Sequence, residues 1–272
     1  MLMYWMFVRI YQVSAAKLRQ HSRPFSYFCS PKAVPILKPV RLNVIVPCYN
    51  PPQDWESALA KRWVAFQETI DGVVEHVGLI VVNDGSQNNA TALNFKALAE
   101  KIPGVTVVNY AENRGKGYAL RQGVAKSEAD FHLVTDTDFP YDMESMKRIV
   151  ETLLEKGGIA AGNRDTGYYA HVPLFRRMIS KVLRWILRNM LRQPISDSQC
   201  GLKGFDNAGK AIFLQTTIDR FLFDLEFLML AKGRVTITPV PVELREGVVF
   251  SKVGMKILAT EGKNFLKLLL RK

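Results

Sequence analysis

Residues 131–138 read FHLVTDTD, an apolar run that ends in two carboxylates two residues apart. The run predicts a buried strand, which places Asp136 and Asp138 at its carboxyl end, where open α/β sheets bind ligands. Two carboxylates suit Mg²⁺ or Mn²⁺ on a diphosphate, because these hard cations take their remaining oxygens from water and phosphate. An Asp-x-Asp also occurs in ordinary surface turns, so the surrounding sequence has to decide.

From residue 42 onward, short β-rich runs alternate with longer helical patterns, which is typical of βαβ units and a mostly parallel sheet. Strands are predicted at Leu42–Val46, Leu79–Asn83, Val105–Asn109, Phe131–Thr135 and Ile159–Ala161. Helices are predicted at Trp55–Ile70, Thr91–Lys101, Lys116–Ser127 and Met143–Lys156. Asp142 is the expected N-cap of the last helix. This order predicts a Rossmann-like α/β fold with helices flanking the sheet.

Beyond Gly162 the alternation is less regular. A loop at 163–173, a strongly basic helical pattern at 174–192 and a second loop at 197–201 follow one another. Later segments are predicted to be helical at Asn207–Leu214 and Leu222–Ala231 and extended at Val235–Leu244. Because no internal repeat or low-complexity stretch interrupts the chain, we expect a single domain at 39–250 with separate terminal segments at 1–38 and 251–272.

The composition is that of a globular protein, with 48% hydrophobic and 23% charged residues among 272. No apolar run approaches the roughly 18 to 20 residues that a membrane-spanning helix requires. The three cysteines are odd in number and lack a C-x-x-C spacing, which argues against a disulfide framework and a structural zinc site. A reducing, cytoplasmic compartment is therefore expected, and the four scattered histidines carry no catalytic assignment.

The net charge of +12 favours polyanionic partners, namely nucleic acid, an anionic membrane surface or phosphorylated substrates. Residues 1–53 contain no Asp or Glu, and residues 251–272 mix lysines with leucines and other apolar residues. The first segment is expected to be a membrane-surface helix or a removed targeting segment. The second is a basic amphipathic helix that lies on a membrane or packs on its own domain.

Two further polar loops are predicted at the edge that carries the Asp-x-Asp. PCYN at 47–50 ends the first strand and NDGS at 83–86 ends the second, and loops after successive parallel strands share one side of a sheet. NRGKG at 113–117 then opens a helix. Its glycines permit close backbone approach, and its N-terminal N–H groups together with Lys116 suit an anion.

The joint order of the motifs resembles a known enzyme family. They are PxYN at 47–50, NDGS at 83–86, NRGKG at 113–117, DxD at 136–138, GNR at 162–164, RxxxS at 176–180 and DSQCGLK at 197–203. In this order they resemble the family 2 glycosyltransferases of GT-A fold, and within them the dolichyl-phosphate β-glucosyltransferases more closely than the dolichyl-phosphate mannose synthases. The resemblance covers roughly Leu42 to Lys252.

The resemblance implies a role for each matching position. Pro47 and Tyr49 would line the pocket of the nucleotide base, and Asp84 would accept a hydrogen bond from it. Asp136 and Asp138 would hold the metal, with Lys116 assisting at the diphosphate. The implied contacts to the lipid phosphate are Arg164, Arg176, Ser180 and Arg245. Asp197, Gln199 and Lys203 are expected among the substrate-binding residues, and Asp138, Arg164 and Arg176 are the expected catalytic residues.

The implied reaction is an inverting transfer of a hexose, with glucose favoured, from UDP-glucose or GDP-mannose to a polyprenyl or dolichyl phosphate at the cytoplasmic face of a membrane. An acceptor phosphate is already anionic, so no strong general base is required. One alternative is a family 2 enzyme with a soluble or polysaccharide acceptor, for which Asp224 or Glu226 would be the base. The other is a non-catalytic module that binds anions or nucleic acid; nucleic acid is disfavoured because no basic and aromatic sheet motif is present.

The chain also departs from the family pattern. Pro51 and Asn83 stand where many relatives carry acids, and Pro140 offers no side-chain ligand downstream of the Asp-x-Asp. Any metal must then be held by Asp136 and Asp138 with water and diphosphate.

Overall fold

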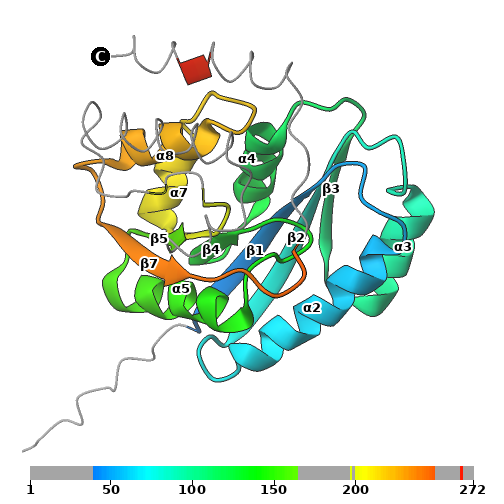
Figure 1. Cartoon of the computed structure of the whole chain (residues 1–272), viewed down its shortest axis with the longest axis horizontal. Helices are drawn as coiled ribbons and strands as arrows, with labels where there is room; N and C mark the ends of the chain where they lie inside the picture. Colours follow the sequence, from blue (N-terminus) through cyan, green and yellow to red (C-terminus); the bar gives the residue numbers. More distant parts are fainter. Residues whose placement is uncertain (1–38, 165–196, 198–199, 249–263, 266–272) are drawn as a thin grey trace, which may run out of the picture. The chain divides into compact units, whose positions relative to one another are not determined.

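The computed structural model describes residues 39–164, 197, 200–248 and 264–265, all within one compact unit, Pro39–Lys272 (Figure 1). The strands are β1 (Arg41–Cys48), β2 (His76–Asp84), β3 (Thr106–Tyr110), β4 (Phe131–Val134), β5 (Ile159–Arg164), β6 (Lys203–Asp206) and β7 (Ile237–Val242). The helices are α2 (Trp55–Thr69), α3 (Ala92–Lys101), α4 (Lys116–Lys126), α5 (Met143–Lys156), α7 (Asn207–Phe213) and α8 (Phe223–Ala231). The predicted segment 1–38, the basic helical pattern at 174–192 and nearly all of 251–272 lie outside these residues.

The seven strands form one sheet in the order β3-β2-β1-β4-β6-β5-β7. Every pairing is parallel except those of β6, which runs antiparallel to both β4 and β5. The mostly parallel α/β sheet predicted from the alternating pattern is confirmed. The prediction missed β6, because its sequence KGFD contains only one large apolar residue and gives no strand pattern.

Two apolar clusters pack on opposite faces of the sheet. Val44 and Val46 of β1 point into a cluster shared with α2, α3 and α5. Ile45, between them, points into a second cluster shared with α4, α7 and α8. Figure 1 shows these two groups of helices on either side of the strands. Phe265 also packs against the second cluster, so this part of the C-terminal segment contacts the domain.

The predicted helix boundaries match closely, and at α5 the predicted capping residue is confirmed. Helix α5 begins and ends at the predicted residues, and the Asp142 carboxylate accepts the Ser145 N–H at 2.5 Å, as an N-cap should. Among the described helices, none is both long and apolar enough to span a bilayer.

His132 of β4 is fully buried and held by neutral partners. Asn43 donates to the Ser127 hydroxyl at 2.9 Å, that hydroxyl lies 2.8 Å from His132 Nδ1, and Nε2 lies 3.3 Å from Asn207 Oδ1. This chain fits a neutral imidazole whose proton is on Nε2. Burial lowers the pKa of His132 to about 4, against a partial opposing effect of the Asn207 contact.

The stability of the protein is expected to fall as the pH drops from about 6.5 to about 4. In that interval the unfolded chain protonates His132 and the folded chain does not, which removes up to about 3 kcal/mol of unfolding free energy. In urea unfolding across this pH interval, the free energy of unfolding should fall less in His132→Gln than in the wild type. Parallel pH profiles of the two proteins would contradict this account.

Candidate functional site

The loops after β1, β2 and β4 meet at one edge of the sheet, as predicted. The Asn50 N–H donates to Ser86 Oγ at 2.9 Å, and Asn50 Oδ1 accepts the Gln87 N–H at 2.8 Å. The Thr137 hydroxyl donates to the Pro47 carbonyl. Tyr49 at this edge is 51% exposed, so its side chain is open to contact with a ligand. The base-pocket role of Pro47 and Tyr49 stays a prediction.

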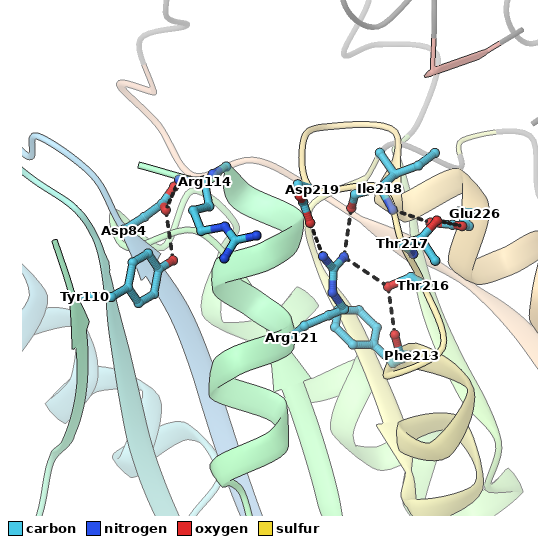
Figure 2. Close-up of polar contacts among 11 residues, drawn as sticks. Asp84, Tyr110, Arg114, Arg121, Phe213, Thr216, Thr217, Ile218, Asp219 and Glu226 are labelled. Carbon is cyan, nitrogen blue, oxygen red and sulfur yellow. Dashed lines mark hydrogen bonds and ion pairs between the residues drawn. The ribbon is translucent and has the colours of Figure 1, made fainter. Parts of the chain in front are cut away.

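Asp84 fixes this edge with a buried carboxylate. Oδ1 accepts from the Tyr110 hydroxyl at 2.9 Å and the Arg114 N–H at 2.8 Å, while Oδ2 accepts from Asn113 Nδ2 at 2.8 Å and the Gly115 N–H at 2.9 Å. Figure 2 shows Asp84 against Tyr110 and Arg114. These four bonds fill the four lone-pair positions of a carboxylate. In the structure, the Asp84 carboxylate holds the loop that leads into α4. Its implied hydrogen bond with a nucleotide base stays a prediction.

The N-terminus of α4 is capped by the protein itself. The N–H groups of Gly117 and Tyr118 donate to the Asp219 carbonyl at 2.8 and 3.2 Å. A Cβ at Gly115, whose φ is +109°, would lie 2.5 Å from the same oxygen. Arg121 pairs with the Asp219 carboxylate and donates to the Ile218 carbonyl, which pins this loop (Figure 2). These glycines and N–H groups face the 218–219 backbone in the structure, and an anion beside Lys116 stays a prediction.

Lys116, the first residue of α4, reaches the Asp-x-Asp. Its Nζ lies 2.5 Å from Asp136 Oδ1, and the two side chains are 18% and 39% exposed. Burial disfavours the charged form of Lys116, but Asp136, Asp224 and Asp138 outweigh it and raise the pKa of Lys116 above its usual value. Lys116 is therefore a fixed positive charge beside the predicted metal ligands.

The donor set at Asp136 and Asp138 fits a divalent cation only with added ligands. Partial burial, and then repulsion from Asp136, raise the pKa of Asp138, which shows that the two carboxylates lack full compensation. Within 39–164, 197, 200–248 and 264–265, no group of three or more His, Cys, Asp or Glu residues could hold a metal. Two carboxylates remain, and diphosphate and water would have to complete the shell.

Arg245 borders the same edge. Its Nε donates to the Phe139 carbonyl at 3.2 Å, and its backbone N–H donates to the Pro140 carbonyl at 3.0 Å. Phe139 adopts a φ of +44°, an uncommon conformation for a bulky residue, directly after Asp138. Arg62 of α2 was not predicted. Burial and then Arg245 lower the pKa of Arg62, and Asp138 opposes this. Nothing in the sequence around Arg62 marks it, because its proximity to Asp138 arises only in the fold.

Arg164 and Asp197, predicted as separate substrate contacts, bind each other. Arg164 Nε lies 2.6 Å from Asp197 Oδ2 and Nη2 lies 2.8 Å from Oδ1, a bidentate pair. Burial opposes the charge of Arg164, but Asp197 outweighs it and raises the pKa of the guanidinium. The pair stabilises the end of β5, and the contact of Arg164 with a lipid phosphate stays a prediction. Arg176, Ser180 and Gln199 lie outside the described residues.

Lys203 lies in the core, so the expectation that it contacts substrate needs correction. Its side chain is 0% exposed, and Nζ donates to Asp224 Oδ1 at 2.6 Å and to the Cys200 carbonyl at 2.5 Å. Glu226 is also buried and accepts from the backbone N–H groups of Thr217 and Ile218, both at 2.8 Å (Figure 2). Asp224 and Glu226, the alternative general bases, are thus both engaged inside the protein.

Lys203→Met is expected to lower the free energy of unfolding by about 3–5 kcal/mol, because it leaves the Asp224 carboxylate buried without its partner. The double variant Lys203→Met/Asp224→Leu should regain most of this loss in urea unfolding. Lys147→Met, which removes a lysine from an exposed pair with Glu151, should cost under about 1 kcal/mol. A double variant no more stable than the single one would contradict this assignment.

Two known proteins are similar in sequence to most of this chain. A dolichyl-phosphate β-glucosyltransferase of Drosophila melanogaster is 31% identical over 71% of this chain and 63% of its own length. The one of Saccharomyces cerevisiae is 25% identical over 79% of this chain and 70% of its own length. The chain therefore covers less than two thirds of the length of the Drosophila relative.

Solved structures share the fold at low identity. Glucosyl-3-phosphoglycerate synthase of Mycobacterium tuberculosis, in complex with Mn²⁺ and UDP-glucose, has a TM-score of 0.58 at 16% identity, over 86% of this chain and 79% of that one. Mannosyl-3-phosphoglycerate synthase of Rubrobacter xylanophilus has a TM-score of 0.60 at 10% identity, over 85% and 73%. These likenesses confirm the GT-A fold. The sequence model described as "Glycosyl transferase family 2" matches residues 43–220, and the chain belongs to that family.

Proposed function

We propose that the protein is an inverting glycosyltransferase that moves a hexose, with glucose favoured, from a nucleotide sugar to a dolichyl or other polyprenyl phosphate. The observation that carries this proposal is the meeting of Lys116, Asp136 and Asp138 at the carboxyl edge of a family 2 sheet. Relatives named dolichyl-phosphate β-glucosyltransferase support the choice of sugar and acceptor.

Asp136 and Asp138 would hold Mg²⁺ or Mn²⁺, which when bound offsets the charge that builds up on the leaving diphosphate. The residues of the chain do the positioning. Asp84 holds the 113–115 loop, and Lys116, the next residue, would lie within reach of the same diphosphate. A cation fixed beside a developing negative charge stabilises the transition state more than the ground state.

The internal contacts of Asp224 and Glu226 favour a phosphate acceptor over a sugar hydroxyl. A hydroxyl acceptor needs a general base within hydrogen-bond reach. Asp224 is bound to Lys203, and Glu226 to the 217–218 backbone. A phosphate oxygen is anionic near neutral pH and attacks the anomeric carbon without such a base, while the bond to the nucleoside diphosphate breaks.

Asp138→Asn is expected to lower turnover by about 100-fold or more, because it removes one of only two carboxylate ligands. The assay combines UDP-glucose or GDP-mannose, Mg²⁺ or Mn²⁺ and a polyprenyl phosphate, and measures lipid-linked hexose. Asp130→Asn makes the same charge change just before β4, in an ion pair with Arg41, and should leave turnover unchanged. Full turnover in Asp138→Asn would remove the metal role, and hexose transfer only to soluble acceptors would favour the alternative function.

The proposed acceptor implies contact with a membrane, at its cytoplasmic face. The net charge of +12 and the absence of acids in residues 1–53 support attraction to anionic lipid, worth about 1 kcal/mol for each lysine or arginine near the surface. The full chain should therefore sediment with vesicles containing anionic lipid at low salt and be released at high salt. Equal recovery in the supernatant with and without anionic vesicles at low salt would contradict membrane attachment.

A further inference from the structure

Four charged side chains alternate in sign from the core to the site. Lys203, fully buried, pairs with Asp224 at 2.6 Å, and Lys116 pairs with Asp136 at 2.5 Å. Asp224 and Lys116 also attract each other. Burial lowers the pKa of Lys116, and Asp136 and then Asp224 raise it. Burial raises the pKa of Asp224 above its usual value, and Lys203 and then Lys116 oppose this only in part. Lys116 therefore lies between two anions, one in the core and one at the predicted metal site.

Close backbone packing holds these charges together. A Cβ at Gly117, next to Lys116, would lie 2.7 Å from Cβ of Phe223, next to Asp224, so the start of α4 touches the start of α8. A Cβ at Gly201 would lie 3.1 Å from Asp136 Oδ2 and 3.4 Å from Lys116 Nζ. The segment 200–203 thus contacts both ion pairs, since Lys203 also donates to the Cys200 carbonyl.

An ammonium on a metal-ligating carboxylate competes with the metal. Lys116 already compensates Asp136 through Oδ1, so a free divalent cation competes with the ammonium for this carboxylate and is repelled by its positive charge. A nucleoside diphosphate brings anionic oxygens that can accept Lys116 instead, which frees Asp136 for the cation. Cation and nucleotide should then bind cooperatively, through a coupling free energy that acts equally in both directions.

We propose that Lys116 is a built-in counter-ion of Asp136 that makes divalent-cation binding depend on the nucleoside diphosphate, and that Asp224 is the positioning residue that shares Lys116 and draws it from Asp136. This inference rests on the proposed function. It assigns Asp224 a role that acts through Lys116 rather than on substrate. Lys203 holds Asp224 in place from the core.

Mn²⁺ binding to the full chain, measured from the electron paramagnetic resonance signal of free Mn²⁺ with and without UDP, tests the first part. The wild type should bind Mn²⁺ at least about fivefold more tightly with UDP. Lys116→Gln should bind Mn²⁺ at least about fivefold more tightly than the wild type when UDP is absent, and should lose most of the effect of UDP. Lys147→Gln removes an equal charge from the surface of α5 and should behave as the wild type.

A double-mutant cycle tests the role of Asp224. Asp224→Asn should weaken Mn²⁺ binding without UDP, because Lys116 is then left to Asp136 alone. In the Lys116→Gln background the same substitution should have no effect if Asp224 acts through Lys116. If Asp224→Asn weakens Mn²⁺ binding equally in both backgrounds, the Asp224 charge acts directly on the metal. That result would overturn the positioning role. If Asp224→Asn does not fold, Lys203→Met/Asp224→Leu replaces it in the cycle.

The outcomes separate this inference from the proposed function. If Mn²⁺ binds the wild type with UDP and Lys116→Gln leaves Mn²⁺ affinity without UDP unchanged, the counter-ion role is overturned and the proposed function stands. If no Mn²⁺ binds the folded wild type even with millimolar UDP or GDP, the metal site of the proposed function fails, and this inference fails with it.

Discussion

The arrangement of the site depends on the four hydrogen bonds that Asp84 accepts. A buried carboxylate without a cationic partner is costly unless donors surround it, and here two side chains and two backbone N–H groups do so. These donors come from β3 and from the loop that opens α4, so one carboxylate joins the end of β2 to both. Because Lys116 is the next residue after Gly115, this bond network fixes the backbone from which its side chain reaches Asp136.

The sequence predicted the elements whose signals are local. Six of the seven strands and the helices show hydrophobic patterns, and α5 with its N-cap Asp142 is the clearest case. Strand β6 was missed because a short strand buried between two neighbours carries no alternation. The edge that gathers Asp136, Asp138 and Tyr49 was also predictable, since parallel strands deliver their following loops to one side.

The partners of the charged residues were not predictable, because ion pairs between distant residues leave no pattern in one sequence. Arg164 and Asp197 read as two ligands and form one pair. Lys203 was predicted to bind substrate, yet it pairs with Asp224 in the core. Asp219 gave no sign that its carbonyl would cap α4. Motif residues thus divide into those that face the ligand edge and those that support it, and only the fold separates the two groups.

The reversed direction of β6 has a consequence for how such an enzyme can vary. Strand β5 ends at the carboxyl edge, and β6, being antiparallel, begins there. The end of β5 at Arg164 and the start of β6 at Lys203 therefore lie at the same edge of the sheet. A connection with both ends at the ligand edge can change in length and sequence while the strand register stays intact.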